Sequence, residues 1–281
     1  MSRIAYVNGR YVPHYQAGVH IEDRGYQFAD GVYEFFSIRR GKLQDESLHL
    51  DRLEYSLSEL DIKMPLPRKA LEFVLQELVA CNRIICGMLY VQVTRGVAKR
   101  NHNIPEDAEP VLTATASPID EKELQRKSEQ GISVITLPDL RWERCDIKAI
   151  GLLPNVLARK LAVEKKADDA WQVGKEGMIT EASAANAWIV DENNMLRTHP
   201  VGNKILNGIT RRVLCRIIEK EKIKFSETAF TPEEAYRAKE SFSTASSFTL
   251  QPVVKIDGHK IGDGKIGTIT RKLAKLYGKY S

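Results

Sequence analysis

The sequence predicts an α+β or α/β protein organised as two domains. The chain has 281 residues, which is enough for one large domain or two of ordinary size. Short apolar runs typical of strands are interspersed with stretches whose leucines recur at helical spacing. The apolar pattern disappears between residues 117 and 131, and such a polar break is typical of a domain boundary. We therefore expect an N-terminal domain over residues 1–118, a linker over 119–125 and a second domain over 126–281.

The composition narrows the class of protein. Hydrophobic residues make up 43% and charged residues 28% of the chain, which is sufficient for a full core. The net charge is +5, but the basic residues are interleaved with acidic ones, which argues against a nucleic-acid partner and allows attraction of small acidic substrates. There is no apolar run of membrane length and no signal-peptide core. The four cysteines lack paired C-x-x-C spacing, so we expect a cytoplasmic protein with reduced thiols and no metal site.

The N-terminal half is expected to begin with strands and turns. An apolar run over residues 4–7 leads into Asn8-Gly9, which is a strong hairpin signal. A strand is predicted over residues 32–38, on which Tyr33 points to one face and Glu34 to the other. Further elements of this half are helices over 47–60 and 69–82 and strands over 88–94 and 111–115.

The second half alternates short strands with helices. Strands are predicted over residues 132–137, 178–180, 187–190 and 195–197. Helices are predicted over residues 157–166, from 210, from 231 and from 267. The helix from Thr231 begins with a capping box and a proline in its first turn.

Lys148 is the first candidate for a chemical role. It lies between Ile147 and the pair Ala149-Ile150, which is unusual because burying an ammonium is costly. Removal from water favours the neutral amine, which can act as a nucleophile or a general base. The alternative is a lysine whose stem lies on apolar surface while its head stays in water.

Several segments are suited to binding anions. Gly208-Ile209-Thr210 enters a helix, where backbone N–H groups and a hydroxyl suit a phosphate, although threonine is also a frequent helix cap. Arg52 lies on a predicted helix, and an aperiodic loop carries Arg100 and His102. Charged loops of this kind are either plain surface or binding sites.

Near the middle of the second half, Glu181 ends a strand and is followed by the small residues 182–185. Such small residues let a flat ligand approach the backbone, or simply pack tightly. A hydroxyl cluster further on includes Ser246 and Ser247. An amine, phosphate donors and a carboxylate are the parts needed to hold pyridoxal phosphate.

With these parts in order, the chain resembles the class IV aminotransferases, the fold type IV pyridoxal-phosphate enzymes, and within them the enzymes that act on D-amino acids. The resemblance covers nearly the whole chain and rests on the segments DRGYQFADGVYE, HLDRL, YVQVTRG, RWERCDIK, ITEASAAN and NGITR. It implies a smaller N-terminal α/β domain and a larger C-terminal pseudo-barrel domain that anchors the cofactor. The run at 182–185 departs from the serine-rich run expected in the family.

The resemblance also implies roles for individual residues. Lys148 is expected to bond to the aldehyde of pyridoxal 5'-phosphate, Glu181 to face the pyridine nitrogen, and Leu206 to pack against the ring. The expected phosphate ligands are Arg52, the backbone at Ile209 and Thr210, and Ser246 with Ser247.

For the substrate, the resemblance implies that Tyr33, Arg100 and His102 bind the α-carboxylate of a D-amino acid. In the family the Arg/His loop and the tyrosine matching Tyr90 reach across from a partner subunit, which implies a homodimer with shared sites. The expected reaction transfers the amino group of a D-amino acid such as D-alanine to a 2-oxo acid such as 2-oxoglutarate, giving pyruvate and D-glutamate.

Four alternatives remain open from the sequence. Branched-chain L-aminotransferases and (R)-amine transaminases share the fold and the lysine, and aminodeoxychorismate lyase shares the scaffold but not the reaction. A non-enzymatic basic surface that binds an acidic partner would need none of the motifs. The pairing of Arg100 with His102 favours a carboxylate substrate over a simple amine.

Overall fold

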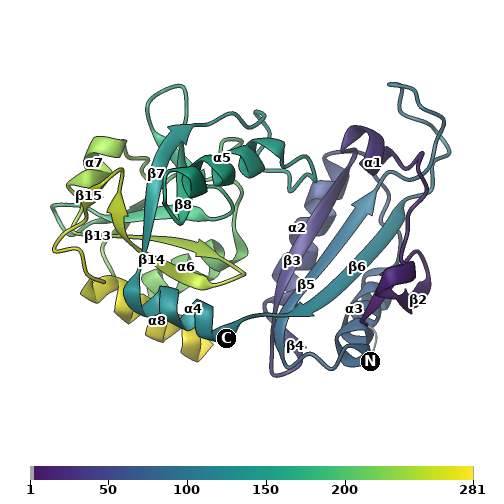
Figure 1. Cartoon of the computed structure of the whole chain (residues 1–281), viewed down its shortest axis with the longest axis horizontal. Helices are drawn as coiled ribbons and strands as arrows, with labels where there is room; N and C mark the ends of the chain where they lie inside the picture. The colour runs from purple at the N-terminus through teal and green to yellow at the C-terminus, as the bar shows by residue number, and fades with distance from the viewer. Residues whose placement is uncertain (1–2, 281) are drawn as a thin grey trace. The chain divides into compact units, whose positions relative to one another are not determined.

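The computed structural model describes residues 3–280, which group into two compact units. The first unit runs up to Ile119 and also takes in Ile147–Gly151, so it contains Lys148. The second unit comprises Asp120–Asp146 and the residues from Leu152 onward. Figure 1 shows the two units as separate sheets with their own helices.

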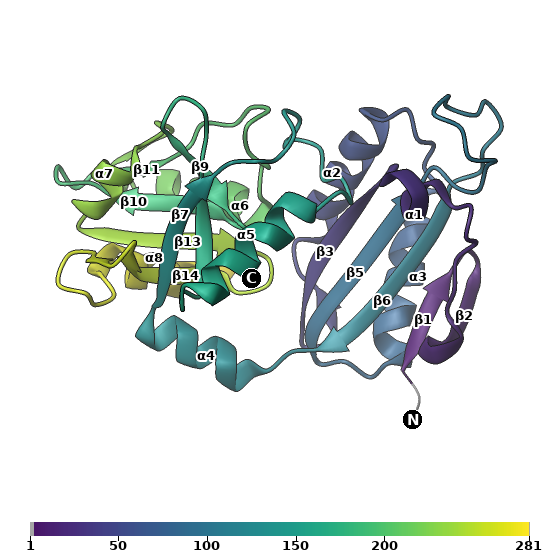
Figure 2. The same cartoon turned by 45° about the horizontal axis from the view of Figure 1, so that its top comes forward.

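The first unit is built on an antiparallel sheet of six strands in the order β2-β1-β6-β5-β3-β4 (Figure 2). The strands are β1 (Ile4–Val7), β2 (Arg10–Pro13), β3 (Gly31–Arg39), β4 (Lys42–Leu43), β5 (Cys86–Thr94) and β6 (Val111–Pro118). The predicted hairpin at Asn8-Gly9 is confirmed, with both residues at positive φ. Burial alternates along β3, so that Glu34 is buried and Tyr33 is half-buried, as the strand period requires.

Helices α2 (Glu46–Ser58) and α3 (Arg68–Cys81) pack on this sheet and complete its core. The leucine stripe of α2, at Leu50, Leu53 and Leu57, is fully buried as expected. Two short helices were not predicted: η1 (His14–Gln16) and α1 (Arg24–Phe28). The second is stabilised by its N-cap residue, because the Asp23 side chain accepts from the Gly25 N–H.

The second unit is built on a curled mixed sheet in the order β12-β11-β10-β13-β14-β7-β8-β9, with β15 paired to β14. Its strands are β7 (Ile132–Pro138), β8 (Asp169–Val173), β9 (Ile179–Ala182), β10 (Asn186–Val190), β11 (Leu196–Thr198), β12 (Phe225–Ser226), β13 (Glu240–Ala245), β14 (Thr249–Ile256) and β15 (His259–Lys260). Strand β8 was missed because it is buried on both faces and shows no polar alternation.

The helices of the second unit are α4 (Glu121–Gln130), α5 (Leu153–Glu164), α6 (Ile209–Lys220), α7 (Pro232–Tyr236) and α8 (Thr268–Tyr280). The capping box before α7 is confirmed, with Thr231 and Glu234 bonding to each other's backbone. The predicted linker over 119–125 overlaps α4, a polar helix that Asp120 caps. This helix was not predicted because it has no buried residues and therefore no apolar stripe at helical spacing.

The expected α+β architecture is therefore confirmed, with an antiparallel sheet in one unit and a curled mixed sheet in the other. Within residues 3–280, no helix has the length and hydropathy needed to span a membrane.

Candidate active site

Lys148 is held against the start of β3 by backbone hydrogen bonds. Its carbonyl accepts from the Tyr33 N–H at 3.0 Å, and its own N–H donates to Oγ of Ser56 at 3.2 Å. The next residues continue the contact, because Ile150 donates to the Gly31 carbonyl at 3.1 Å. A Cβ at Gly31 would meet the backbone oxygen of Val93 on β5 at 2.6 Å and Cδ1 of Ile150 at 3.2 Å, so this packing requires glycine. The backbone of Lys148 is thus held by strand β3 on one side and by helix α2 on the other.

The Lys148 side chain lies over an aromatic ring and is half-buried, less than its aliphatic neighbours suggested. Its Nζ is 4.1 Å from the centroid of the Tyr33 ring. A ring face attracts a cation and holds the amine in one place. Tyr33 in turn packs on Tyr90 of strand β5, with ring centroids 5.4 Å apart. Burial raises the pKa of Tyr90 to about 12, so its hydroxyl stays protonated and donates to Gln92 at 2.7 Å.

The opposite face of β3 carries a buried ionic cluster that the sequence did not single out. Glu34 accepts from Nε and Nη2 of Arg52 at 2.7 and 2.9 Å, and His49 Nδ1 lies 2.7 Å from the same carboxylate. Burial would raise the pKa of Glu34, but the Arg52 charge and the hydrogen bonds lower it well below the ordinary value. Burial lowers the pKa of His49, so its neutral ring donates from Nδ1. Arg52 is thereby fixed in a bidentate pair.

Arg100 and His102 lie on the exposed loop between β5 and β6. Both contact Phe28, with Arg100 Cζ 4.6 Å and the His102 ring 5.5 Å from its ring centroid. Arg95, at the start of the same loop, is instead buried and donates from Nε to Asp30 at 2.8 Å. Arg95 therefore has a structural role, whereas Arg100 and His102 form an exposed pair.

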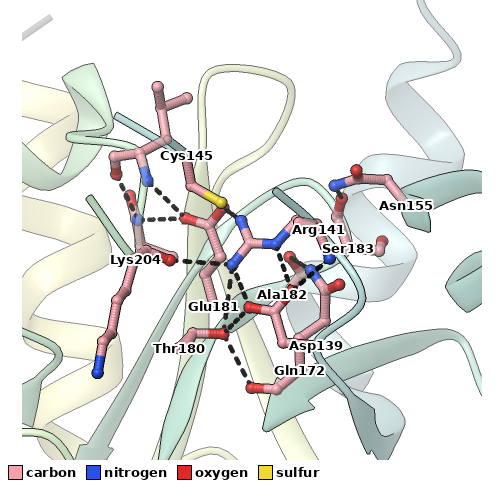
Figure 3. Close-up of polar contacts among 12 residues, drawn as sticks. Asp139, Arg141, Cys145, Asn155, Gln172, Thr180, Glu181, Ala182, Ser183 and Lys204 are labelled. Carbon is pink, nitrogen blue, oxygen red and sulfur yellow. Dashed lines mark hydrogen bonds and ion pairs between the residues drawn. The ribbon is translucent and has the colours of Figure 1, made fainter. Parts of the chain in front are cut away.

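In the second unit, Glu181 lies one residue before the end of β9 and is surrounded by hydrogen-bond donors (Figure 3). Its Oε1 accepts from Nη1 of Arg141. Its Oε2 accepts from Nδ2 of Asn186 at 3.2 Å and from the backbone N–H of Leu206 at 3.1 Å. The carbonyl of Leu206 also accepts a hydrogen bond from Nδ2 of Asn186, at 2.9 Å. These donors favour the ionised carboxylate.

Arg141 links Glu181 to a second carboxylate. It donates from Nε and Nη2 to Asp139 at 2.9 and 2.6 Å, and from Nη2 to the Lys204 carbonyl at 3.0 Å (Figure 3). Thr180 completes the network by donating to Asp139 at 2.8 Å. Burial would raise the pKa of Asp139, but Arg141 lowers it. One buried guanidinium therefore balances two acids.

The N-terminus of α6 begins at Ile209, one residue before the predicted start. Gly208 precedes it, and a Cβ there would come within 2.2 Å of Oδ1 of Asn186. Packing therefore requires glycine at position 208. Asn186, which donates to Glu181, lies directly against the N-terminus of α6 as a result. Thr210 is buried in the first turn.

The hydroxyl cluster predicted from the sequence comprises Ser243, Thr244, Ser246 and Ser247, and the structure separates it into two parts. Ser243 and Thr244 lie in β13 and accept from the indole N–H groups of Trp171 and Trp188 at 3.1 and 2.9 Å, so they belong to the core. The segment containing Ser246 and Ser247 forms the half-exposed turn between β13 and β14. This second part, unlike the first, is partly exposed to solvent.

The sequence-predicted residues thus fall into groups that the fold gathers locally. Lys148, Tyr33 and Tyr90 form one group in the first unit. Glu181 and Leu206 form another in the second unit. Glu34 and Arg141 were missed as partners, although the strand alternation placed Glu34 on the face opposite Tyr33, which the structure shows to be buried.

Comparisons with known proteins agree with this chemistry. The family model for amino-transferase class IV matches residues 31–256. A D-alanine aminotransferase of Staphylococcus haemolyticus is 41% identical over 276 residues, covering 98% of this chain and 96% of that protein. One from Listeria monocytogenes is 42% identical over 274 residues, covering 96% and 93%.

Solved structures share the fold. A branched-chain amino acid aminotransferase of Escherichia coli superposes with a TM-score of 0.93 at 20% identity, covering 99% of this chain and 94% of that one. A PLP-bound hypothetical aminotransferase of Mycobacterium tuberculosis gives a TM-score of 0.83 at 22% identity, with 98% and 97% covered.

Proposed function

The chain belongs to the class IV aminotransferase family, and from this premise we propose that it transfers an amino group between a D-amino acid and a 2-oxo acid. The proposal rests on the sequence identity of 41% and 42% to two proteins named D-alanine aminotransferase, over 98% and 96% of this chain. D-Alanine is accordingly the proposed donor and 2-oxoglutarate the proposed acceptor. The products would be pyruvate and D-glutamate.

The cofactor is pyridoxal 5'-phosphate, and the donor set fits it. Lys148 supplies an amine that the Tyr33 ring holds in place. Glu181 supplies a carboxylate that Arg141 and Asn186 favour in its ionised form. When bound, the cofactor acts as an electron sink for the pair left on the substrate Cα.

Lys148 is the residue we assign to proton transfer at the substrate Cα. Hydrogen bonds fix the Lys148 backbone, and the Tyr33 ring holds its amine, so the amine can take a proton and return it at one place. The side from which it acts determines the hand of the product. Glu181 is assigned to hold negative charge beside the ring nitrogen, where a carboxylate keeps that nitrogen protonated.

For the phosphate we propose the backbone and hydroxyl at the start of α6, where N–H groups and the helix dipole favour an anion. Arg52 and the turn with Ser246 and Ser247 are proposed as further ligands. Arg52 has a rigid setting for this role, because Glu34 holds its guanidinium in a bidentate pair.

We assign the substrate α-carboxylate to Arg100, His102 and Tyr33. Guanidinium and imidazole groups donate charge-assisted hydrogen bonds, and the first can bind a carboxylate with two of them. The exposed position of Arg100 and His102 suits a ligand that arrives from solvent.

We also propose a cytoplasmic homodimer in which this loop and Tyr90 serve the partner's site. Four apolar side chains of α5 recur at helical spacing and are exposed to solvent: Leu153 by 68%, Val156 by 60%, Leu157 by 44% and Leu161 by 40%. The opposite side of α5 already packs on its own unit through Ala158 and Ala162. A second copy that covers the exposed stripe would bury this apolar surface. Sedimentation of the protein and of a Val156→Asp variant tests this, and an unchanged monomer in both would reject it.

The function is tested by the visible spectrum of the pure protein before and after addition of D-alanine or L-alanine. D-Alanine should change the cofactor spectrum and yield pyruvate, whereas L-alanine should do neither. A response to L-amino acids alone would favour the branched-chain alternative. Pyruvate formed from aminodeoxychorismate without an amino acceptor would favour the lyase.

A further inference from the structure

Helix α1 is anchored firmly to the end of β5, although it is only one and a half turns long by its bounds Arg24–Phe28. The carboxylate of Asp23 accepts from the Gly25 N–H at 2.8 Å and from Thr94 Oγ1 at 2.9 Å. The Arg24 N–H donates to the Gly96 carbonyl at 2.9 Å. A Cβ on Gly25 would meet the Thr94 side chain at 2.2 Å. This helix is thus a fixed support beside the loop that carries Arg100.

The side chain of Arg24 extends from this support to the loop backbone. It is buried, and its Nη1 donates to the carbonyls of Asn101 and Asn103 at 2.8 and 3.4 Å. Its Nε donates to Asp30 at 2.7 Å. Burial would raise the pKa of Asp30, but Arg95 and Arg24 lower it, so the carboxylate remains charged and holds Arg24 in place. The backbone on either side of position 102 is therefore fixed by one arginine.

Phe28, at the other end of the same helix, contacts the side chains of the loop. The Cζ atoms of Arg24 and Arg100 lie over its ring, 4.9 and 4.6 Å from the centroid. The His102 ring is 5.5 Å away. A guanidinium that lies over a ring is held by the attraction between its charge and the ring face, and its N–H groups can still turn away from the ring. Those N–H groups are the part that binds a carboxylate with two parallel hydrogen bonds.

We propose that Phe28 is a positioning residue for the substrate carboxylate: its ring pre-orients Arg100 and His102, on a loop backbone that Arg24 holds. This inference rests on the proposed function and names how one part of that site is organised. An exposed arginine has many rotamers and would lose this freedom when it binds a substrate. A side chain already stacked on a fixed ring loses less, so the substrate binds better.

The test compares Phe28→Leu with Phe73→Leu in the full-length enzyme. Leucine keeps apolar volume at position 28 but removes the ring face, and Phe73 is a matched control because it is 69% exposed on α3. Loss of the stacking should lower kcat/KM for D-alanine roughly two- to fivefold, mainly through KM. It should leave kcat/KM for (R)-1-phenylethylamine, which has no carboxylate, at the parent value. Phe28→Tyr should restore D-alanine use, because tyrosine offers the same face.

A second measurement needs no substrate. In a crystal structure of the Phe28→Leu holoenzyme, the Arg100 side chain should be displaced or disordered, while Phe28→Tyr keeps it in place. An unmoved Arg100 in Phe28→Leu, or equal losses with both substrates, would overturn the proposal. If Arg100→Ala leaves kcat/KM for D-alanine intact, Arg100 does not bind the substrate carboxylate and that part of the proposed function fails. If Arg100→Ala lowers kcat/KM for D-alanine and Phe28→Leu does not, only the positioning role of Phe28 fails.

Discussion

The amine of Lys148 lies over the ring of Tyr33, with Nζ 4.1 Å from the ring centroid. The two residues are also joined through the backbone, because the Tyr33 N–H donates to the Lys148 carbonyl at 3.0 Å. The lysine is thus positioned by the strand that carries the tyrosine. A side chain fixed in this way is suited to a repeated proton transfer at one atom.

Replacement of that amine gives the first prediction. Lys148→Ala should lower kcat by about a hundred- to ten-thousandfold, the usual contribution of general acid–base catalysis. It should also remove the absorption that arises when the cofactor is joined to a lysine. Stopped-flow assays and absorption spectra measure both effects, and Lys175→Ala is the control because Lys175 has an 86% exposed side chain. Retention of turnover and absorption in Lys148→Ala would show that another residue does the chemistry.

The second prediction concerns Glu181, the carboxylate near the end of β9. Glu181→Gln should keep the cofactor bound but lower kcat by about a hundred- to a thousandfold, because a neutral amide does not hold the ring nitrogen protonated. Single-turnover kinetics with D-alanine and cofactor content by absorption separate the two properties. Glu143→Gln, at an 86% exposed glutamate, is the control. Undiminished proton abstraction in Glu181→Gln would remove Glu181 from this role.

Arg141 gives a prediction about stability. Its side chain is 6% exposed and balances both Asp139 and Glu181. Arg141→Leu should lower the free energy of unfolding by about 3–5 kcal/mol, because it leaves two buried carboxylates without their cation. Arg144 pairs with Asp146 at a 36% exposed position, so Arg144→Leu should cost no more than about 1 kcal/mol. Urea denaturation of both variants measures this, and equal costs would contradict the assigned importance of the buried network.

The fourth prediction separates a carboxylate substrate from a simple amine. Arg100→Ala should lower kcat/KM for D-alanine roughly ten- to a hundredfold, the loss expected for about 1.5–3 kcal/mol of charge-assisted hydrogen bonding. It should affect (R)-1-phenylethylamine far less, and Arg126→Ala, on the exposed helix α4, should affect neither. In mixed dimers, inactive Arg100 and Lys148 variants should partly complement each other. A loss below about twofold for D-alanine would favour the amine-transaminase alternative.

The last prediction is a dependence of stability on pH. The pKa of Glu34 is lowered in the folded protein, since Arg52 and His49 outweigh the effect of burial. Its contribution is therefore complete above the unfolded-state pKa of about 4.3 and is lost as the pH falls toward the lower folded-state pKa. Glu34→Gln should cost about 3–5 kcal/mol at pH 7, and the difference from the parent should shrink below about pH 4. Urea denaturation at pH 7 and pH 3.5 measures it, and a pH-independent difference would contradict the ionic role of Glu34.

Local signals in the sequence were sufficient for much of the fold. The hairpin at Asn8-Gly9, the leucine stripe of α2 and the capping box at Thr231 each depend on residues close together in the chain, and each is present. Strand β8 and helix α4 were missed, since a strand buried on both faces and a helix without an apolar stripe lack the expected periods. Motifs spread along the chain were enough to indicate the family, because they combine several weak signals in a fixed order.

The sequence by itself determined which residue types carry the chemistry: an amine at Lys148, a carboxylate at Glu181 and a charged loop with Arg100 and His102. Only the tertiary structure decided what surrounds them. Glu34 meets Arg52 across 18 positions of sequence, and Arg141 meets Glu181 across 40. Partners so far apart leave no periodic trace in a single sequence, because packing alone brings them into contact and removes the water that would otherwise weaken their interaction.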